Sequence, residues 1–213
     1  MSLPHPSSFR PELSSDRLQI IANWLLDEFY STQDDLSRNT DSGYGRGCTT
    51  FDRQRNRIRL EAISGNWPWL QTLNSTFDLV FTVGGVPCRF SNDDPLNPTK
   101  KAVLEGNGYQ LSFQEFAGTE GPSRFCFVID RGLDGAGEPH VELHGFDATG
   151  ALVCRWISDT PRVLYAESVQ QAPTVQVGKP SVTPRQPGTD VTEANDGATE
   201  AQSEAADTSS PEP

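Results

Sequence analysis

A helical pattern of apolar residues occupies the segment between Ser15 and Tyr30. Apolar side chains recur there at the three- and four-residue spacing of one helix face. The acids and amides fall elsewhere; they are Asp16, Gln19, Asn23, Asp27 and Glu28. The apolar positions are Leu18, Ile21, Ala22, Leu25, Leu26 and Phe29. Ser14 and Ser15, which precede the pattern, are typical N-cap residues. We therefore predict an N-terminal amphipathic helix that covers a flat apolar surface.

Most of the following sequence has patterns typical of β-strands. Two apolar runs in STFDLVFTVGGVPCRFSND are joined by Gly84-Gly85, which favours a two-residue hairpin turn. The segments GYQLSFQEF (108–116) and SRFCFVID (123–130) read as further strands, and HVELHGFDATGALVCRWIS (140–158) reads as a second hairpin. A short helix is expected within PTKKAVL (98–104). Because strands joined by short turns are antiparallel, we predict an α+β fold in which the N-terminal amphipathic helix backs an antiparallel β-sheet.

The stretch FDRQRNRIRLEAI, residues 51–63, carries an arginine at every second position: Arg53, Arg55, Arg57 and Arg59. If Ile58 to Ile63 is a strand, Ile58 and Leu60 point to the core and the neighbouring arginines point to solvent. Two interpretations stay open. The arginines are either the solvated face of a half-buried strand or a cationic stripe that binds carboxylates, phosphates or an acidic protein surface.

The composition changes near residue 168. Residues 168–213 contain no aromatic side chain and are rich in Ala, Pro, Ser, Thr and acids. Such a segment cannot bury enough apolar area to offset its conformational entropy, so we predict a disordered acidic tail. The remaining chain is expected to form one α+β domain over residues 10–167, preceded by a flexible N-terminus over residues 1–9.

The charge of the chain restricts its partners. The net charge is −12, of which the predicted tail carries −5 and the remainder −7. This balance argues against nucleic acid and against an anionic membrane surface, because both require clustered cations. We expect no secretory leader, since MSLPHPSSFRPEL has no basic region followed by an apolar run, and no membrane span, since no apolar run is long enough to cross a bilayer. A cytoplasmic protein with a protein partner is therefore expected.

Candidate chemistry is sparse. No common catalytic motif occurs, and His5, His140 and His144 are the only histidines, so enzymatic activity is not predicted. The four cysteines are widely spaced, which favours reduced core residues over zinc ligands; they are Cys48, Cys88, Cys126 and Cys154. GYGRG (43–47) has the composition of a phosphate-binding loop but lacks its sequence context, so a flexible loop is expected. Asp93-Asp94 is expected to serve a turn.

Three segments together resemble a family. Gly47-Cys48, GNWPWLQTLNSTFDL (65–79) and VELHGFDATGALV (141–153) are similar, in the same order, to a repeat unit of the bacterial haemin-degrading and haem-trafficking proteins. The matching positions are Trp69, Leu70, Leu73, Phe77, Leu79, Phe146, Asp147 and Gly150. The resemblance implies an antiparallel α+β fold and haem as the cofactor.

The family's iron ligand is a helix histidine, and the predicted helix from Ser15 to Tyr30 has none. Haem ligation would instead require His140 or His144, which lie four residues apart on one face of a predicted strand. We expect a non-enzymatic binding or accessory protein that engages an acidic protein or ligand through a sheet face and the arginine stripe. The alternative is a haem- or tetrapyrrole-binding or trafficking protein. The sequence leaves the oligomeric state open.

Overall fold

The computed structural model describes residues 2–117, 121–132 and 137–158. Its elements are, in order, η1 (Pro6–Ser8), α1 (Ser15–Asp35), α2 (Gly43–Ser64), β1 (Leu70–Thr72), β2 (Phe81–Val83), β3 (Val86–Asn92), α3 (Lys101–Leu104), α4 (Gly108–Ala117), β4 (Arg124–Asp130), β5 (His140–Phe146) and β6 (Leu152–Ile157). The predicted tail, residues 168–213, lies outside the described residues. η1 falls within residues 1–9, and its Pro6 is buried.

The strands form one sheet in the order β1-β2-β3-β4-β5-β6. Neighbouring strands are antiparallel except β3 and β4, which are parallel. The α+β prediction with an antiparallel-rich sheet is therefore confirmed. The parallel pair arises because the connection from β3 to β4 carries α3 and α4, and parallel neighbours need such a crossover.

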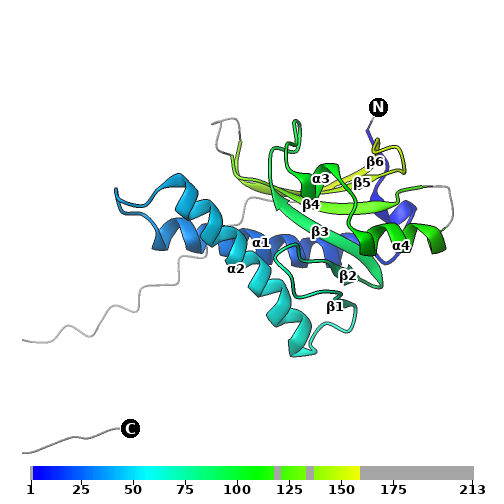
Figure 1. The fold of residues 1–213 in the computed structure, drawn as a ribbon, viewed down its shortest axis with the longest axis horizontal. Coiled ribbons are helices and arrows are strands. Elements are labelled where there is room, and N and C mark those ends of the chain that lie inside the picture. The colour runs from blue at the N-terminus through cyan, green and yellow to red at the C-terminus, as the bar shows by residue number, and fades with distance from the viewer. Residues whose placement is uncertain (1, 118–120, 133–136, 159–213) are drawn as a thin grey trace, which may run out of the picture. The chain divides into compact units, whose positions relative to one another are not determined.

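Both faces of the sheet are covered (Figure 1). The predicted helix is α1, and its apolar face packs on one side of the sheet; the core there includes Leu18, Ile21, Leu25, Phe81, Phe125, Phe127 and Leu143. On the other side, Val103 of α3 packs with Cys126, Val128 and Phe146 in a smaller cluster. The N-terminal helix therefore backs the sheet as predicted.

The two predicted hairpins are present because their turns are encoded locally. Gly84 and Gly85 have φ values of 61° and 90° between β2 and β3. A side chain at position 84 would place its Cβ 2.6 Å from the Cβ of Glu12, so the turn also passes close to the N-terminal segment. In the β5–β6 turn, Asp147 Oδ1 accepts hydrogen bonds from the backbone N–H groups of Thr149 and Ala151, each at 2.9 Å. The short helix that the sequence predicted within PTKKAVL (98–104) is also present, as α3.

The strand predicted for the arginine-rich stretch is wrong, because this stretch lies in α2. The side chain of Ser42 caps the first turn by accepting from Gly45 N at 3.0 Å, and Gly65 ends the helix with φ 73°. The buried positions are Thr50, Gln54 and Ile58, spaced by four residues. Two of these three are polar, so the apolar helical period is weak in the sequence. Leu60, which the strand placed in the core, is 65% exposed.

The first turns of α2 also correct the interpretation of GYGRG. Residues 43–47 are helical and do not form a flexible loop. Cys48, the next residue, is exposed on α2, whereas Cys88, Cys126 and Cys154 are buried. All four are free thiols, so the expectation of reduced core cysteines holds for three of them.

The strand predicted at GYQLSFQEF is wrong as well, because these residues form α4. Asn107 Oδ1 accepts from Tyr109 N at 3.1 Å in the first turn. Gln110 is buried, and its Nε2 donates to Phe125 O at 2.8 Å, while Tyr109 and Leu111 are about half exposed. The alternation of polar and apolar residues in GYQLSFQEF therefore does not show which side chains are buried, because the polar Gln110 is buried and the apolar Leu111 is about half exposed.

Candidate functional site

The helical geometry of α2 divides the four arginines into two pairs. Residues two apart on a helix differ by about 200° around its axis, whereas residues four apart share a flank. Arg53 and Arg57 face α1, where Arg53 Nη1 lies 2.6 Å from Asp35 Oδ2 and Arg57 Nη1 lies 3.7 Å from Glu28 Oε1. A continuous arginine stripe therefore does not form, and these two charges meet carboxylates of their own chain.

The second arginine pair, Arg55 and Arg59, lies on the opposite flank of α2. Arg55 Nη2 contacts Asp52 Oδ1 at 2.7 Å, and its guanidinium carbon lies 5.3 Å from the centroid of the Phe77 ring. Arg55 is thus also engaged within the chain. For an external acidic partner, α2 offers less free positive charge than the sequence pattern indicated.

The two predicted histidines do lie on one face of β5, and Glu142 lies between them. His144 Nε2 donates to Glu142 Oε2 at 2.6 Å, and His140 Nε2 donates to Glu142 Oε1 at 3.2 Å. Arg155 of β6, directly across from His144 in the strand register, donates its Nη2 to the same Oε1. Glu142 and Arg155 were missed in the sequence, although the His-x-Glu-x-His spacing on a strand is a signal that places all three side chains together.

Glu142 is a buried carboxylate that its neighbours keep ionised. Its side chain is 1% exposed, and that of His144 is 2% exposed. Burial alone raises the pKa of Glu142, but the hydrogen bonds from His144, Arg155 and His140 together lower this pKa to about 2. The carboxylate is therefore charged at neutral pH and holds Arg155 and both imidazoles in place.

A cleft of about 660 Å³, here called the end cleft, lies beside this cluster. It is bordered by the loop after β3, the end of β4, the start of β5, and Arg155. Its ionisable lining residues are Asp93, Asp94, Lys100, Asp130, Arg131, His140, Glu142 and Arg155. A concave site of this size with several converging polar groups is a common form of ligand site.

The acids that line the end cleft accept hydrogen bonds from within the chain. Asp93 Oδ2 accepts from Thr99 N at 2.9 Å and from Lys100 N at 2.8 Å. Asp94 Oδ1 accepts from Leu96 N at 2.8 Å, and Asp130 Oδ1 accepts from Gly132 N at 2.8 Å. Glu142, the fourth of these acids, accepts the hydrogen bonds from His140, His144 and Arg155 that are described above. These contacts shape the loops and partly satisfy the negative charges.

Two cations in the end cleft are less well compensated. Lys100 Nζ donates to the carbonyl oxygen of Asn92, and the pKa of Lys100 is lowered by burial and then by the nearby charge of Arg131, with Asp93 acting in the opposite direction. Among the described residues, Arg131 has no hydrogen bond or ion pair. Its Nη1 would lie 3.6 Å from a Cβ added at Gly47, which places the guanidinium against α2. Lys100 and Arg131 are therefore two neighbouring positive charges, and the cleft acids do not form ion pairs with them.

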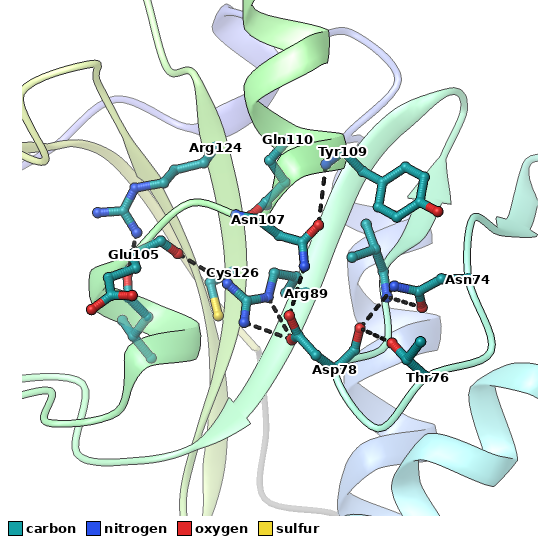
Figure 2. Close-up of polar contacts among 12 residues, drawn as sticks. Asn74, Thr76, Asp78, Arg89, Glu105, Asn107, Tyr109, Gln110, Arg124 and Cys126 are labelled. Carbon is teal, nitrogen blue, oxygen red and sulfur yellow. Dashed lines mark hydrogen bonds and ion pairs between the residues drawn. The ribbon is translucent and has the colours of Figure 1, made fainter.

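A second polar cluster fastens α3 and α4 to the sheet (Figure 2). Arg89 donates Nε and Nη2 to Asp78 Oδ1 at 2.9 and 2.6 Å, and Asn107 Nδ2 donates to Asp78 Oδ2 at 2.6 Å. Arg89 Nη1 also donates to Glu105 O at 2.9 Å, and Arg124 donates to the carbonyl oxygen of Val103. Arg89 Nη1 and Arg124 thus donate to backbone carbonyls at and just after the end of α3, and Asp78 joins Arg89 to Asn107. We therefore assign this cluster a structural role.

Within the described ranges, no group of three or more His, Cys, Asp or Glu side chains is arranged to hold a metal ion. In the same part of the chain, no helix combines the length and apolarity needed to cross a bilayer. Comparisons with protein-family models, curated proteins and solved structures find no match.

Proposed function

We propose that this protein is a non-enzymatic binding module that receives an acidic group of a partner or ligand in the end cleft. The observation that carries the proposal is the pair of neighbouring cations, Lys100 and Arg131, in a cleft whose carboxylates accept hydrogen bonds from other groups. The proposal keeps the expected class of partner but moves the contact surface from the arginines of α2 to the end of the sheet.

The physical argument is the cost of two like charges held close together on the wall of one cleft. Burial and the charge of Arg131 both disfavour the protonated form of Lys100. A carboxylate or phosphate bound between the two side chains would reverse that cost. The guanidinium of Arg131 would supply paired N–H donors, and Lys100 would supply a compact ammonium charge.

The two candidate surfaces can be separated by two double variants with equal loss of charge. Lys100→Gln with Arg131→Gln alters the end cleft, and Arg55→Gln with Arg59→Gln alters one flank of α2. Succinate and inorganic phosphate serve as probes, titrated into the full chain and followed by amide chemical shifts in low and moderate salt. We expect shifts concentrated in residues 92–100 and 130–132, and at least about tenfold weaker binding in the cleft variant only.

Salt supplies a second criterion, since an interaction with partly exposed cations weakens as ionic strength rises. Lys101→Gln is a matched control for the Lys100→Gln change in the cleft variant. Lys101 is one residue from Lys100 but lies outside the cleft lining, so this control is expected to bind the probes as the wild type does. Equal binding of the probes by the wild type and the cleft variant at both salt concentrations would refute the proposal. Weaker binding in the α2 variant alone would return the function to the arginines of α2.

The haem alternative rests on the sequence resemblance and makes a different prediction. An axial ligand needs an imidazole nitrogen that the iron can reach. The His144 ring is buried, and both ring nitrogens of His140 are engaged, Nδ1 with Glu138 O and Nε2 with Glu142 Oε1. We therefore expect the Soret band of added haemin to be the same with the wild type, His140→Ala and His144→Gln. A Soret shift seen with the wild type and lost in either variant would instead support haem ligation.

A further inference from the structure

The rim of the end cleft carries an apolar side chain as well as cations. Leu96 lines the cleft and is 84% exposed, the highest value among the large hydrophobic residues that the structure describes. A single exposed leucine is unremarkable on a protein surface. Its position on the same cleft as Lys100 and Arg131 is what makes it informative, because the cleft then offers an apolar contact as well as a cationic one.

The loop that presents Leu96 is held by its own hydrogen bonds. Asp93 accepts from the backbone of Thr99 and Lys100, which closes the loop, and Asp94 accepts from the backbone of Leu96 itself. Pro95, next to Leu96, is buried. Leu96 is therefore displayed from a fastened segment, so that contact with a partner needs little further ordering.

Building on the proposed function, we infer that the ligand of the end cleft is a short protein segment in which an apolar residue adjoins an acidic one. The acid would meet Lys100 and Arg131, and the apolar side chain would cover Leu96. A cleft of about 660 Å³ is much larger than a single carboxylate or phosphate and has room for neighbouring side chains.

The charge of the chain favours this class of partner over a strongly acidic one. Outside residues 168–213 the net charge is −7, which repels a polyanion at long range. A segment with one acid can use the local cations without a large repulsion, and its apolar neighbour adds binding that salt does not screen.

Two peptides that differ only beside the acid test the inference. The probes are acetylated and amidated Gly-Leu-Glu-Leu-Gly and Gly-Ser-Glu-Ser-Gly, with succinate as the free dicarboxylate. We expect the leucine peptide to bind the full chain about tenfold more tightly than the serine peptide. Leu96→Ser should remove that difference, and Leu104→Ser, a half-exposed leucine outside the cleft lining, should leave it intact.

The outcomes separate this inference from the proposed function. If both peptides and succinate bind equally well and Leu96→Ser has no effect, while Lys100→Gln with Arg131→Gln weakens all three, the inference is overturned and the proposed function stands. If the cleft double variant leaves every probe unaffected, the proposed function fails and the inference fails with it. Loss of the leucine-peptide advantage in Leu96→Ser alone supports the inference.

Discussion

Replacing Glu142 by Gln is expected to lower the free energy of unfolding by about 3 kcal/mol at pH 7. The pKa of this buried carboxylate lies at about 2 instead of its ordinary value of 4.5, and each pH unit of such a difference corresponds to about 1.4 kcal/mol. The Gln side chain keeps the shape of Glu142 but removes the charge that holds His144 and Arg155. Denaturant unfolding at pH 7 measures the loss.

The same prediction has a pH dependence with a definite sign. Because the pKa of Glu142 is lower in the folded state than in the unfolded state, the unfolded state binds a proton more readily between about pH 4.5 and pH 2. The stabilisation from Glu142 is therefore complete above pH 4.5 and is lost as the pH falls towards 2. The difference between wild type and Glu142→Gln should shrink across this window.

Glu138→Gln is the matched control, because Glu138 is an exposed acid just before β5. It should change the unfolding free energy by no more than about 0.5 kcal/mol. A loss below about 1 kcal/mol in Glu142→Gln at pH 7 would show that the buried cluster contributes little net stability. A larger loss that does not vary between pH 6 and pH 3 would show that the ionised carboxylate is not its source.

The second large effect concerns α2. Ile58→Ala is expected to cost about 3 kcal/mol, since Ile58 is fully buried and its truncation leaves a cavity in the core between α2 and α1. Leu60→Ala should cost at most about 0.5 kcal/mol, since Leu60 is exposed on the same helix and Ala has the highest helix propensity. Chemical denaturation of both variants in one buffer gives the comparison.

This pair distinguishes the helix from a strand directly. In a strand, positions 58 and 60 point to the same side, so both truncations would be costly. Similar large losses in the two variants would contradict the helical assignment of residues 43–64. Unequal losses, with Ile58→Ala much the larger, are the expected result.

Some elements follow from the sequence because their determinants are local. The α1 pattern contains enough apolar positions to define one face without knowledge of what covers it. The β2–β3 and β5–β6 hairpins depend on turn residues that act within four positions, namely Gly84-Gly85 and Asp147 with Gly150. Alternation on β5 likewise places His140 and His144 on one face.

Other elements were misassigned because buried polar residues conceal their period. Gln54 of α2 occupies a core position: its Nε2 donates to Leu25 O at 2.8 Å, and its Oε1 accepts from Asn92 Nδ2 at 2.8 Å. Gln110 of α4 is buried in the same way against the backbone of Phe125. A buried amide is stable only when such partners are present, and these partners lie at least 15 residues away in the chain.

The sequence by itself determined the α1 helix, the two tight hairpins, the α+β class and the shared face of the two histidines, because each depends on residues close together in the chain. Tertiary structure alone decided that Arg53 and Arg57 of α2 meet acids of α1 and that Arg55 lies over the ring of Phe77. It also decided the end cleft, where Lys100, Arg131 and Arg155 come from separate segments. Their proximity depends on the crossover between β3 and β4 and on the pairing of β5 with β6, which no local pattern encodes.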